Sequence, residues 1–246
     1  MCSLKIAVAQ VPSKKGNIKA NLATHLNAIE KANNQGVSYL VFPELSLTGY
    51  EPELASRLAF TTDDNRFLPL IESAKKHKIH IGIGAPIATD GLPQVGLFII
   101  TPDGSVETYA KMNVTPTESK FFSAGTKYHT MEIDGVIIAN AICADTNNPS
   151  HIKAYADMNA TVYIAGVITT DNGYKADSAM LSGYAHKLNM LIAIANHNQP
   201  TGAWTPIGKS SIWDSCGPIA VAGIKQSTLV IATKNKDGWS GQQVLI

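Results

Sequence analysis

The sequence predicts an α/β protein with mixed sheets, and two observations support this fold class. Apolar segments typical of buried strands alternate with segments in which apolar residues recur every three or four positions, as on one face of a helix. Tight turns also join neighbouring strands into hairpins, so the sheets are expected to contain antiparallel as well as parallel pairs. The helices are therefore expected in outer layers that cover mixed sheets.

The first half of the chain is expected to alternate strands with helices. In residues 17–34 the apolar residues lie on one helical face, and Gly36 ends this helix. A second helix of the same periodicity is expected at residues 64–78. Strands are expected at residues 4–10, 37–42, 79–85, 95–100 and 105–110, and the turn at 101–104 (TPDG) makes the last two a hairpin.

The second half is expected to begin with an irregular loop at residues 111–126 and a hairpin at 128–142. Asn148 suits the N-cap of the helix that follows, and Pro149 suits its first position. The remaining expected elements are a strand at 161–167, a helix at 174–187, a strand at 190–196 and three short closing strands at 210–214, 219–222 and 228–234.

Length and charge exclude several classes of protein. The 246 residues contain no recognisable linker, which favours a single domain over residues 1–246. Lys and Arg number 20 against 19 Asp and Glu, and no basic run exceeds two residues, so no nucleic-acid interface is expected. No apolar run approaches the roughly 20 residues of a membrane helix. The low charged fraction of 16% indicates surface buried in a large sheet core or between subunits.

The cysteines and histidines indicate reduced thiols and no metal centre. Cys2, Cys143 and Cys216 are odd in number and widely spaced, and no secretory signal precedes the first strand. This pattern favours a cytoplasmic protein. No CxxC or HxxxH pair occurs and the seven histidines are scattered, so a zinc site is not expected.

Three reactive side chains follow predicted core strands. Glu44 comes just after the strand at 37–42, Lys111 directly after the strand at 105–110, and Cys143 directly after the second strand of the 128–142 hairpin. Taken singly, each has a more common explanation as a packed thiol, a solvated carboxylate or a surface amine. Together they have a chemical logic. A carboxylate can accept the proton of a thiol whose free pKa is about 8.5, and an ammonium group can stabilise the thiolate and an oxyanion.

The stretches around these residues resemble the nitrilase, or carbon–nitrogen hydrolase, superfamily. The similarity spans nearly the whole chain, including the first strand and residues 208–214, and the order Glu, Lys, Cys matches with gaps of 67 and 32 residues (from 44 to 111 and from 111 to 143). The three stretches are residues 42–50 (FPELSLTGY), residues 109–112 (YAKM) with 116–118 (PTE) and 121–125 (FFSAG), and residues 142–145 (ICAD) with Pro149.

The resemblance implies a four-layer αββα sandwich with two stacked mixed β-sheets, and it implies roles for five residues. Cys143 is the implied nucleophile, Glu44 the general base, and Lys111 with the backbone N–H of Ala144 the oxyanion donors. Glu118 matches the second glutamate of the family, which positions substrate and base. No metal or organic cofactor is implied, and a homodimer or higher homo-oligomer is expected through the helices beside the cysteine.

The implied activity is hydrolysis of a non-peptide carbon–nitrogen bond in a small linear amide or carbamoyl compound, through a cysteine thioester with release of ammonia. Acyl transfer to an amine, nitrile hydrolysis and a non-catalytic protein of the same fold remain alternatives, because the same residues would serve. Ala144 and Asn147 stand where the family usually carries an aromatic residue and an arginine, and residues 185–189 also depart from its pattern. These departures leave the substrate and the oligomeric state open.

Two smaller interpretations concern the surroundings of the site. Tyr50 and Phe121 are candidate pocket walls. A Cys–His dyad is a weaker alternative, since Glu44 already supplies a base; its candidate histidines are His151, His186 and His197.

Overall fold

The computed structural model describes residues 3–246, whose strands form two sheets. Cys2, one of the expected reduced thiols, lies outside this range. The strands of the first sheet are β1 (Lys5–Gln10), β2 (Tyr39–Val41), β3 (His80–Ile87), β4 (Gln94–Ile100), β5 (Val106–Ala110), β12 (Thr228–Asn235) and β13 (Gly238–Leu245). Those of the second are β6 (Thr130–Ile133), β7 (Val136–Ile142), β8 (Val162–Val167), β9 (Leu191–Asn196), β10 (Ser211–Asp214) and β11 (Gly217–Val221).

Both sheets are mixed, as the hairpins predict. The first has the strand order β13-β12-β1-β2-β3-β4-β5 and the second has the order β11-β10-β9-β8-β7-β6. The pairs β1–β2, β2–β3, β7–β8 and β8–β9 are parallel, and the remaining pairs are antiparallel.

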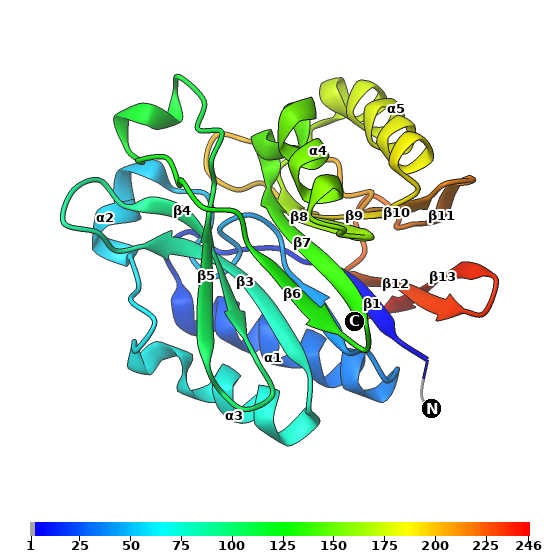
Figure 1. Cartoon of the computed structure of the whole chain (residues 1–246). Helices are drawn as coiled ribbons and strands as arrows, with labels where there is room; N and C mark the ends of the chain where they lie inside the picture. The colour runs from blue at the N-terminus through cyan, green and yellow to red at the C-terminus, as the bar shows by residue number, and fades with distance from the viewer. Residues whose placement is uncertain (1–2) are drawn as a thin grey trace.

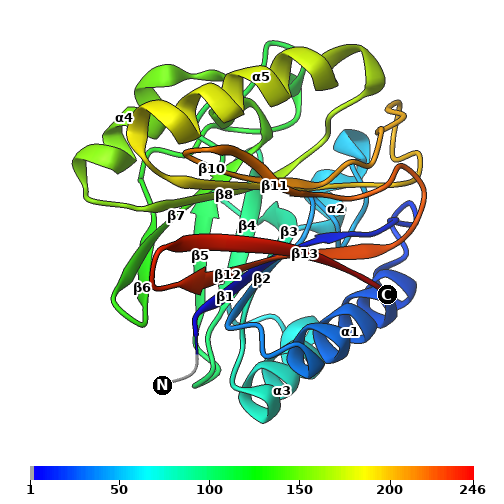
Figure 2. The ribbon, with the colours of Figure 1, turned by 90° about the vertical axis from the view of Figure 1, so that its right-hand side faces the viewer.

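Helices cover the outer face of each sheet, which gives the expected four-layer αββα sandwich (Figures 1 and 2). The pair α1 (Ile18–Asn34) and α3 (Leu68–His77) packs on the first sheet. The pair α4 (Pro149–Asp157) and α5 (Asp171–Leu188) packs on the second. A short helix, α2 (Ala55–Leu58), follows the loop after β2.

The strand residues alternate between two apolar layers, because successive side chains of a strand point to opposite faces. In β1, Ile6 and Val8 pack between the sheets, whereas Ala7 and Ala9 pack beneath the α1 and α3 layer. In the second sheet, Ile164 faces the other sheet and Tyr163 faces α4 and α5. The core is thus three apolar layers that separate the four layers of secondary structure.

The predicted N-cap at Asn148 is confirmed, because its side chain accepts the N–H of Ser150 at 3.0 Å. Asn17, expected only as the first residue of its helix, is the N-cap of α1 and accepts the N–H of Ala20 at 3.1 Å. Two helix boundaries shift. The helix expected at 64–78 is a 3₁₀ turn followed by α3, and the helix expected at 174–187 begins earlier, at Asp171.

The expectation of three closing strands is wrong, because β13 adds a fourth. It pairs antiparallel with β12, with Ser240 opposite Thr233. Most of its residues are exposed, so it lacks the apolar alternation that marks a half-buried strand. Among residues 3–246, no helix combines the length and the apolar character needed to cross a bilayer.

Candidate functional site

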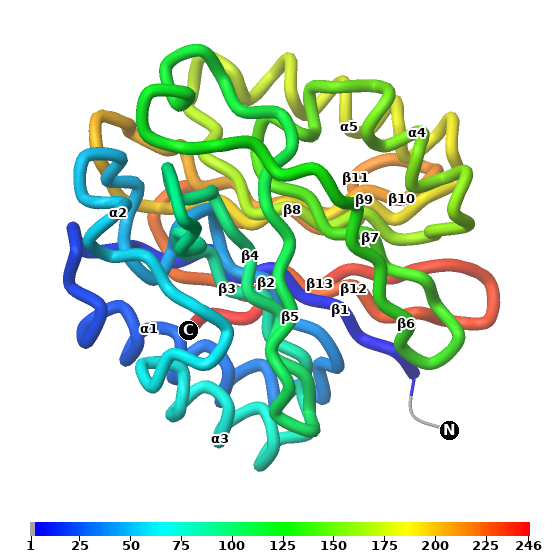
Figure 3. Tube along the Cα trace, turned by 60° about the vertical axis from the view of Figure 1, so that its left-hand side comes forward, coloured from blue at the N-terminus to red at the C-terminus, as the bar shows by residue number. Residues whose placement is uncertain are grey.

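The chain topology brings the strand ends that carry the three reactive residues to one end of the sandwich. Strand β5 is antiparallel to β4, which is antiparallel to β3, which is parallel to β2, so β5 and β2 run in the same direction. Across the two sheets, β5 lies beside β7 (Figure 3). Glu44, Lys111 and Cys143 therefore leave their strands toward a common site, as carboxyl-end residues do in other α/β proteins.

The ammonium group of Lys111 lies between two buried carboxylates. Its Nζ is 2.9 Å from Glu44 Oε1 and 2.6 Å from Glu118 Oε1. Relative exposure is 1% for Lys111, 2% for Glu44 and 4% for Glu118. Because each charge is removed from water, each depends on the others for its stability. The structure thus brings together three of the predicted site residues in one ionic cluster.

The two carboxylates differ in their affinity for a proton. Burial raises the pKa of Glu44 and outweighs the opposing effect of Lys111. Burial also acts on Glu118, but the charge and hydrogen bond of Lys111, with further donors, hold its pKa below the usual value. Carboxylates whose environments push their pKa values apart take different roles. Glu44 is thus suited to accept a proton, and Glu118 to remain ionised.

Glu118 is fixed by two further donors. The Tyr50 hydroxyl donates to its Oε1 at 2.8 Å, and the backbone N–H of Thr115 donates to its Oε2 at 2.9 Å. Tyr50, expected only as a pocket wall, is therefore a hydrogen-bond donor within the ionic cluster. These bonds hold Glu118 against Lys111 and away from the role of a mobile base.

Cys143 begins a 3₁₀ turn directly after β7 and has a left-handed backbone, with φ of 43°. Such a conformation costs about 1–3 kcal/mol for a residue other than glycine and persists only where the surroundings enforce it. Burial, followed by the charge of Glu44, raises the pKa of the Cys143 thiol, although Lys111 and a hydrogen bond from the Ile168 backbone oppose this. The resting thiol therefore keeps its proton, and its ionisation would require a base.

The turn that carries Glu44 is clamped between the two sheets. A Cβ on Gly84 of β3 would lie 2.4 Å from the Pro43 carbonyl oxygen, and one on Gly166 of β8 would lie 2.8 Å from the Glu44 nitrogen. Leu45, the next residue, adopts a left-handed φ of 51°. Only strands that lack side chains at these two points allow so close an approach, which fixes the Glu44 backbone relative to both sheets.

Two buried histidines, His197 and His25, form hydrogen bonds with the turn that carries Glu44. His197 Nε2 donates to the Glu44 carbonyl oxygen at 2.8 Å, and His25 Nε2 lies 2.9 Å from the Ser46 hydroxyl. The Ser13 hydroxyl donates to the Ser46 carbonyl at 2.7 Å. Burial lowers the pKa of both histidines to about 4, so both are neutral near pH 7.

These histidines predict a loss of stability in acid. Their folded pKa values lie below the unfolded value of about 6.5, so their stabilisation is complete above pH 6.5 and declines as the pH falls toward 4. The loss is on the order of 3 kcal/mol for each histidine. Urea unfolding at pH 7.5 and 4.5 measures it, and a His25→Gln variant should lose less stability over this interval. Parallel profiles for the two proteins would contradict the assignment.

The remaining predicted residues are Ala144, Asn147 and the three histidines of the alternative dyad. Ala144 is partly exposed and is the second residue of the 3₁₀ turn, where N–H groups have no partner within the helix. Asn147 is exposed. The three dyad candidates are engaged elsewhere: His151 with Tyr163, His186 with the Ser215 carbonyl, and His197 with Glu44.

Sequence reasoning considered His197 only as a weak candidate for a Cys–His dyad and did not predict its support of the Glu44 turn, although it directly follows a completely buried strand. A titratable residue at such a strand end was the available signal, but its partner lies 153 positions away along the chain. Within the described residues, no group of three His, Cys, Asp or Glu side chains is arranged to hold a metal ion.

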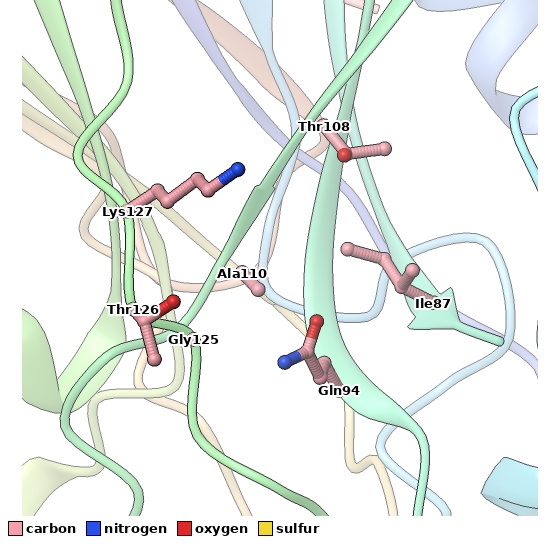
Figure 4. A pocket seen from close by; sticks show the side chains of 7 residues that line it. All are labelled: Ile87, Gln94, Thr108, Ala110, Gly125, Thr126 and Lys127. Carbon is pink, nitrogen blue, oxygen red and sulfur yellow. The ribbon is translucent and has the colours of Figure 1, made fainter. Parts of the chain in front are cut away.

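A hollow of about 230 Å³ lies near the strand end that carries Lys111, but it contains none of the ionic cluster (Figure 4). Ala110 and Gly125 line it, and the Gly125 N–H donates to the Lys111 carbonyl at 2.8 Å. Its polar side chains are neutral apart from Lys127. With neither a thiol nor a carboxylate, this hollow cannot carry the acid–base chemistry of the cluster.

Comparison with known proteins agrees with this geometry. The carbon–nitrogen hydrolase family model matches residues 5–239. An (R)-stereoselective amidase from Pseudomonas sp is 28% identical over 166 residues, covering 65% of this chain and 59% of that protein. A 2-oxoglutaramate amidase from Bacillus subtilis (strain 168) is 30% identical over 140 residues, covering 54% of this chain and 53% of that protein. The chain thus spans little more than half the length of these two curated relatives.

Solved structures give the same fold. A mutant of the amidase from Nesterenkonia sp. AN1 superposes with a TM-score of 0.87 at 20% identity, covering 96% of this chain and 92% of that one. That structure has the acetamide moiety of fluoroacetamide added covalently at its active site cysteine. At this identity the likeness concerns the fold.

Proposed function

Because this chain belongs to the carbon–nitrogen hydrolase family, within the nitrilase superfamily, we propose that it is an amidase with Cys143 as nucleophile. Its substrate is a small linear amide or carbamoyl compound, and its products are the carboxylic or carbamic acid and ammonia. The observation that carries this proposal is the cluster in which Lys111 Nζ contacts both Glu44 and Glu118 next to Cys143.

In the first half-reaction, Glu44 accepts the thiol proton as the Cys143 sulfur attacks the carbonyl carbon. The new C–S bond displaces the carbonyl electrons onto oxygen, and the charge is stabilised by Lys111 Nζ and the N–H of Ala144. Protonated Glu44 then passes its proton to the nitrogen as the C–N bond breaks. Ammonia leaves, and a thioester remains on Cys143.

In the second half-reaction, Glu44 takes a proton from water as the water oxygen attacks the thioester carbon. The same two donors stabilise the second oxyanion, and the C–S bond breaks as the proton returns to sulfur. Glu118 stays ionised throughout and holds Lys111 in place. The raised pKa of Glu44 and the lowered pKa of Glu118 support this division of roles.

The surroundings of the nucleophile support a short acyl group without a charge of its own. Met112, Phe121 and Ile168 pack against the same apolar cluster as Cys143. The neighbouring cation, Lys111, is already paired with the carboxylates of Glu44 and Glu118. The small side chain of Ala144 leaves room beside the sulfur. The two amidase relatives named above are consistent with an amide rather than a nitrile substrate.

A panel of short amides, with ammonia release as the measurement, tests the proposal. We expect turnover of at least one uncharged aliphatic amide, and we expect fluoroacetamide to leave a covalent adduct that peptide mapping assigns to Cys143. Adding an amine to the same reaction separates hydrolysis from acyl transfer, because a transferase would form the substituted amide. Absence of both ammonia and adduct across amides, nitriles and carbamoyl compounds would contradict an enzymatic role.

We also propose that the chain self-associates through the layer of α4 and α5. The outer face of α5 carries small residues, including Gly183, where a Cβ would meet no neighbouring atom. Met158, at the end of α4, is 42% exposed. A face of this kind can approach a second copy closely, and light scattering in solution measures the outcome.

A further inference from the structure

Asp145, two residues after the nucleophile, is completely buried and accepts five hydrogen bonds. Its Oδ2 accepts from the Ile142 N–H at 3.0 Å and from the Tyr109 hydroxyl at 2.7 Å. Its Oδ1 accepts from the Met112 N–H at 3.2 Å and from both the backbone and the side-chain N–H of Asn113 at 2.8 Å. All five neighbours are donors, so the group is a carboxylate.

These bonds join the two segments that carry Cys143 and Lys111. Ile142 precedes the nucleophile, and Met112 follows the lysine. Asn113 extends the connection, because its Oδ1 accepts from the Asn148 side chain at 2.8 Å. Asn148 in turn caps α4. The turn at Cys143 and the Lys111 loop are thus both held to one carboxylate, and the Asn113–Asn148 bond adds a direct link between them.

A chain of buried side chains fixes the orientation of this carboxylate. The Tyr109 hydroxyl has one proton and gives it to Asp145, so its oxygen must accept from His151 Nε2, which lies 2.9 Å away. In neutral His151 the other nitrogen, Nδ1, is then an acceptor, and the Tyr163 hydroxyl lies 3.0 Å from it. Burial lowers the pKa of His151, which agrees with the neutral form. Every proton in the chain therefore points toward Asp145.

We propose that Asp145, oriented by the Tyr109–His151–Tyr163 chain, is the positioning residue that sets the distance between the Cys143 sulfur and the Lys111 ammonium. The inference rests on the proposed function, since it concerns the alignment of nucleophile and oxyanion donor. Asp145 does not contact the reacting atoms; it acts through Ile142 on one side and through Met112 and Asn113 on the other. Misplacement of a reacting group by about 1 Å can cost on the order of a hundredfold in rate.

An Asp145→Asn variant isolates the link to the nucleophile. The asparagine oxygen can still accept from Met112 and Asn113, and the Tyr109–His151–Tyr163 chain can reverse direction to accept from its amide. The Ile142 N–H cannot reverse, so it loses its acceptor directly beside Cys143. We expect kcat on a short amide to fall about a hundredfold, with KM changed less than about threefold.

Two further variants separate positioning from general damage to the core. Tyr109→Phe removes one bond to Asp145 and should lower kcat about tenfold. Tyr39→Phe removes a similarly buried hydroxyl, which donates to Asn140 Oδ1 at 2.6 Å and is not part of the Tyr109–His151–Tyr163 chain. This control should lower the melting temperature to a similar extent without changing kcat. Equal effects of Tyr109→Phe and Tyr39→Phe on kcat would overturn the proposal, and this comparison decides it even if Asp145→Asn does not fold.

A second readout does not depend on amide turnover. The rate of iodoacetamide labelling at Cys143, relative to the exposed Cys216 in the same molecule, should fall in Asp145→Asn and Tyr109→Phe but not in Tyr39→Phe. If the wild-type protein hydrolyses no amide, the proposed function fails while this ratio still tests positioning. A labelling ratio that is unchanged in both Asp145→Asn and Tyr109→Phe would rule out positioning by Asp145.

Discussion

Replacing Lys111 with methionine is expected to lower kcat by roughly a hundred- to a thousandfold and also to destabilise the protein. The rate falls because the developing oxyanion loses a charged donor. Stability falls because Glu44 and Glu118 remain buried as like charges without the ammonium that now lies 2.9 and 2.6 Å from them. Breaking a buried ion pair by removing one partner typically costs about 3–5 kcal/mol. Ammonia release and urea unfolding at pH 8 measure the two effects.

The double variant Lys111→Met/Glu118→Gln separates these two consequences. Removing one carboxylate relieves the repulsion, so most of the lost stability should return, while kcat stays low because the oxyanion donor is still absent. Relative to the wild type, which carries the same two buried histidines, the single variant should also recover stability as the pH is lowered from 8 to 5. Its folded carboxylates have raised pKa values and bind protons more readily than the unfolded chain does. A single variant of normal stability would show that the cluster is not the tight ionic unit described above.

The sequence predicted the positions of most strands and helices because their apolar periodicity is local. It also identified Glu44, Lys111 and Cys143 as strand-end residues, which again requires only neighbouring positions. Their convergence depends on strand directions within and between two sheets, and periodicity carries no information about that. The family resemblance supplied the expectation, and the ionic contacts of Lys111 with Glu44 and Glu118 show that two of the three strand ends meet.

The buried polar residues that support the site could not be found in this way. His197 contacts Glu44 across 153 positions, and Asp145 contacts Tyr109 across 36. Each is a single polar residue near an apolar strand, a pattern that also fits an ordinary loop. Strand β13 was missed for a related reason, because its pairing with β12 is made by the backbone and leaves its side chains largely exposed.

Replacing Glu44 with glutamine is expected to abolish turnover while leaving the nucleophile reactive. The amide keeps the size of the side chain, and its oxygen can still accept from Lys111, so the turn between Gly84 and Gly166 is preserved. The variant has no base for the thiol or for water, and the loss of general acid–base catalysis typically costs 10²–10⁴-fold. We therefore expect ammonia release to fall by about a thousandfold or more.

The same substitution should make Cys143 easier to ionise. The charge of Glu44 raises the pKa of the thiol and that of Lys111 lowers it, so removing the Glu44 charge leaves only the smaller effect of Glu118 to oppose that of Lys111. Labelling of Cys143 by iodoacetamide at pH 7 should then be at least as fast as in the wild type. An activated ester, whose leaving group needs no proton, should acylate Cys143 in the variant. The thioester should accumulate and be visible by intact mass, because no base remains to deprotonate the water that would hydrolyse it.

A matched control for Glu44→Gln is Glu51→Gln, a substitution in the same loop at a carboxylate that pairs with Lys15 at 3.2 Å. It should leave kcat unchanged, because the side chain of Glu51 bonds to Lys15 and to the Gly202 N–H and not to Cys143 or Lys111. If Glu44→Gln loses labelling and turnover in parallel, the glutamate supports structure rather than catalysis. Divergence of the two rates, with an accumulated acyl adduct, is the result that only a general base at Glu44 predicts.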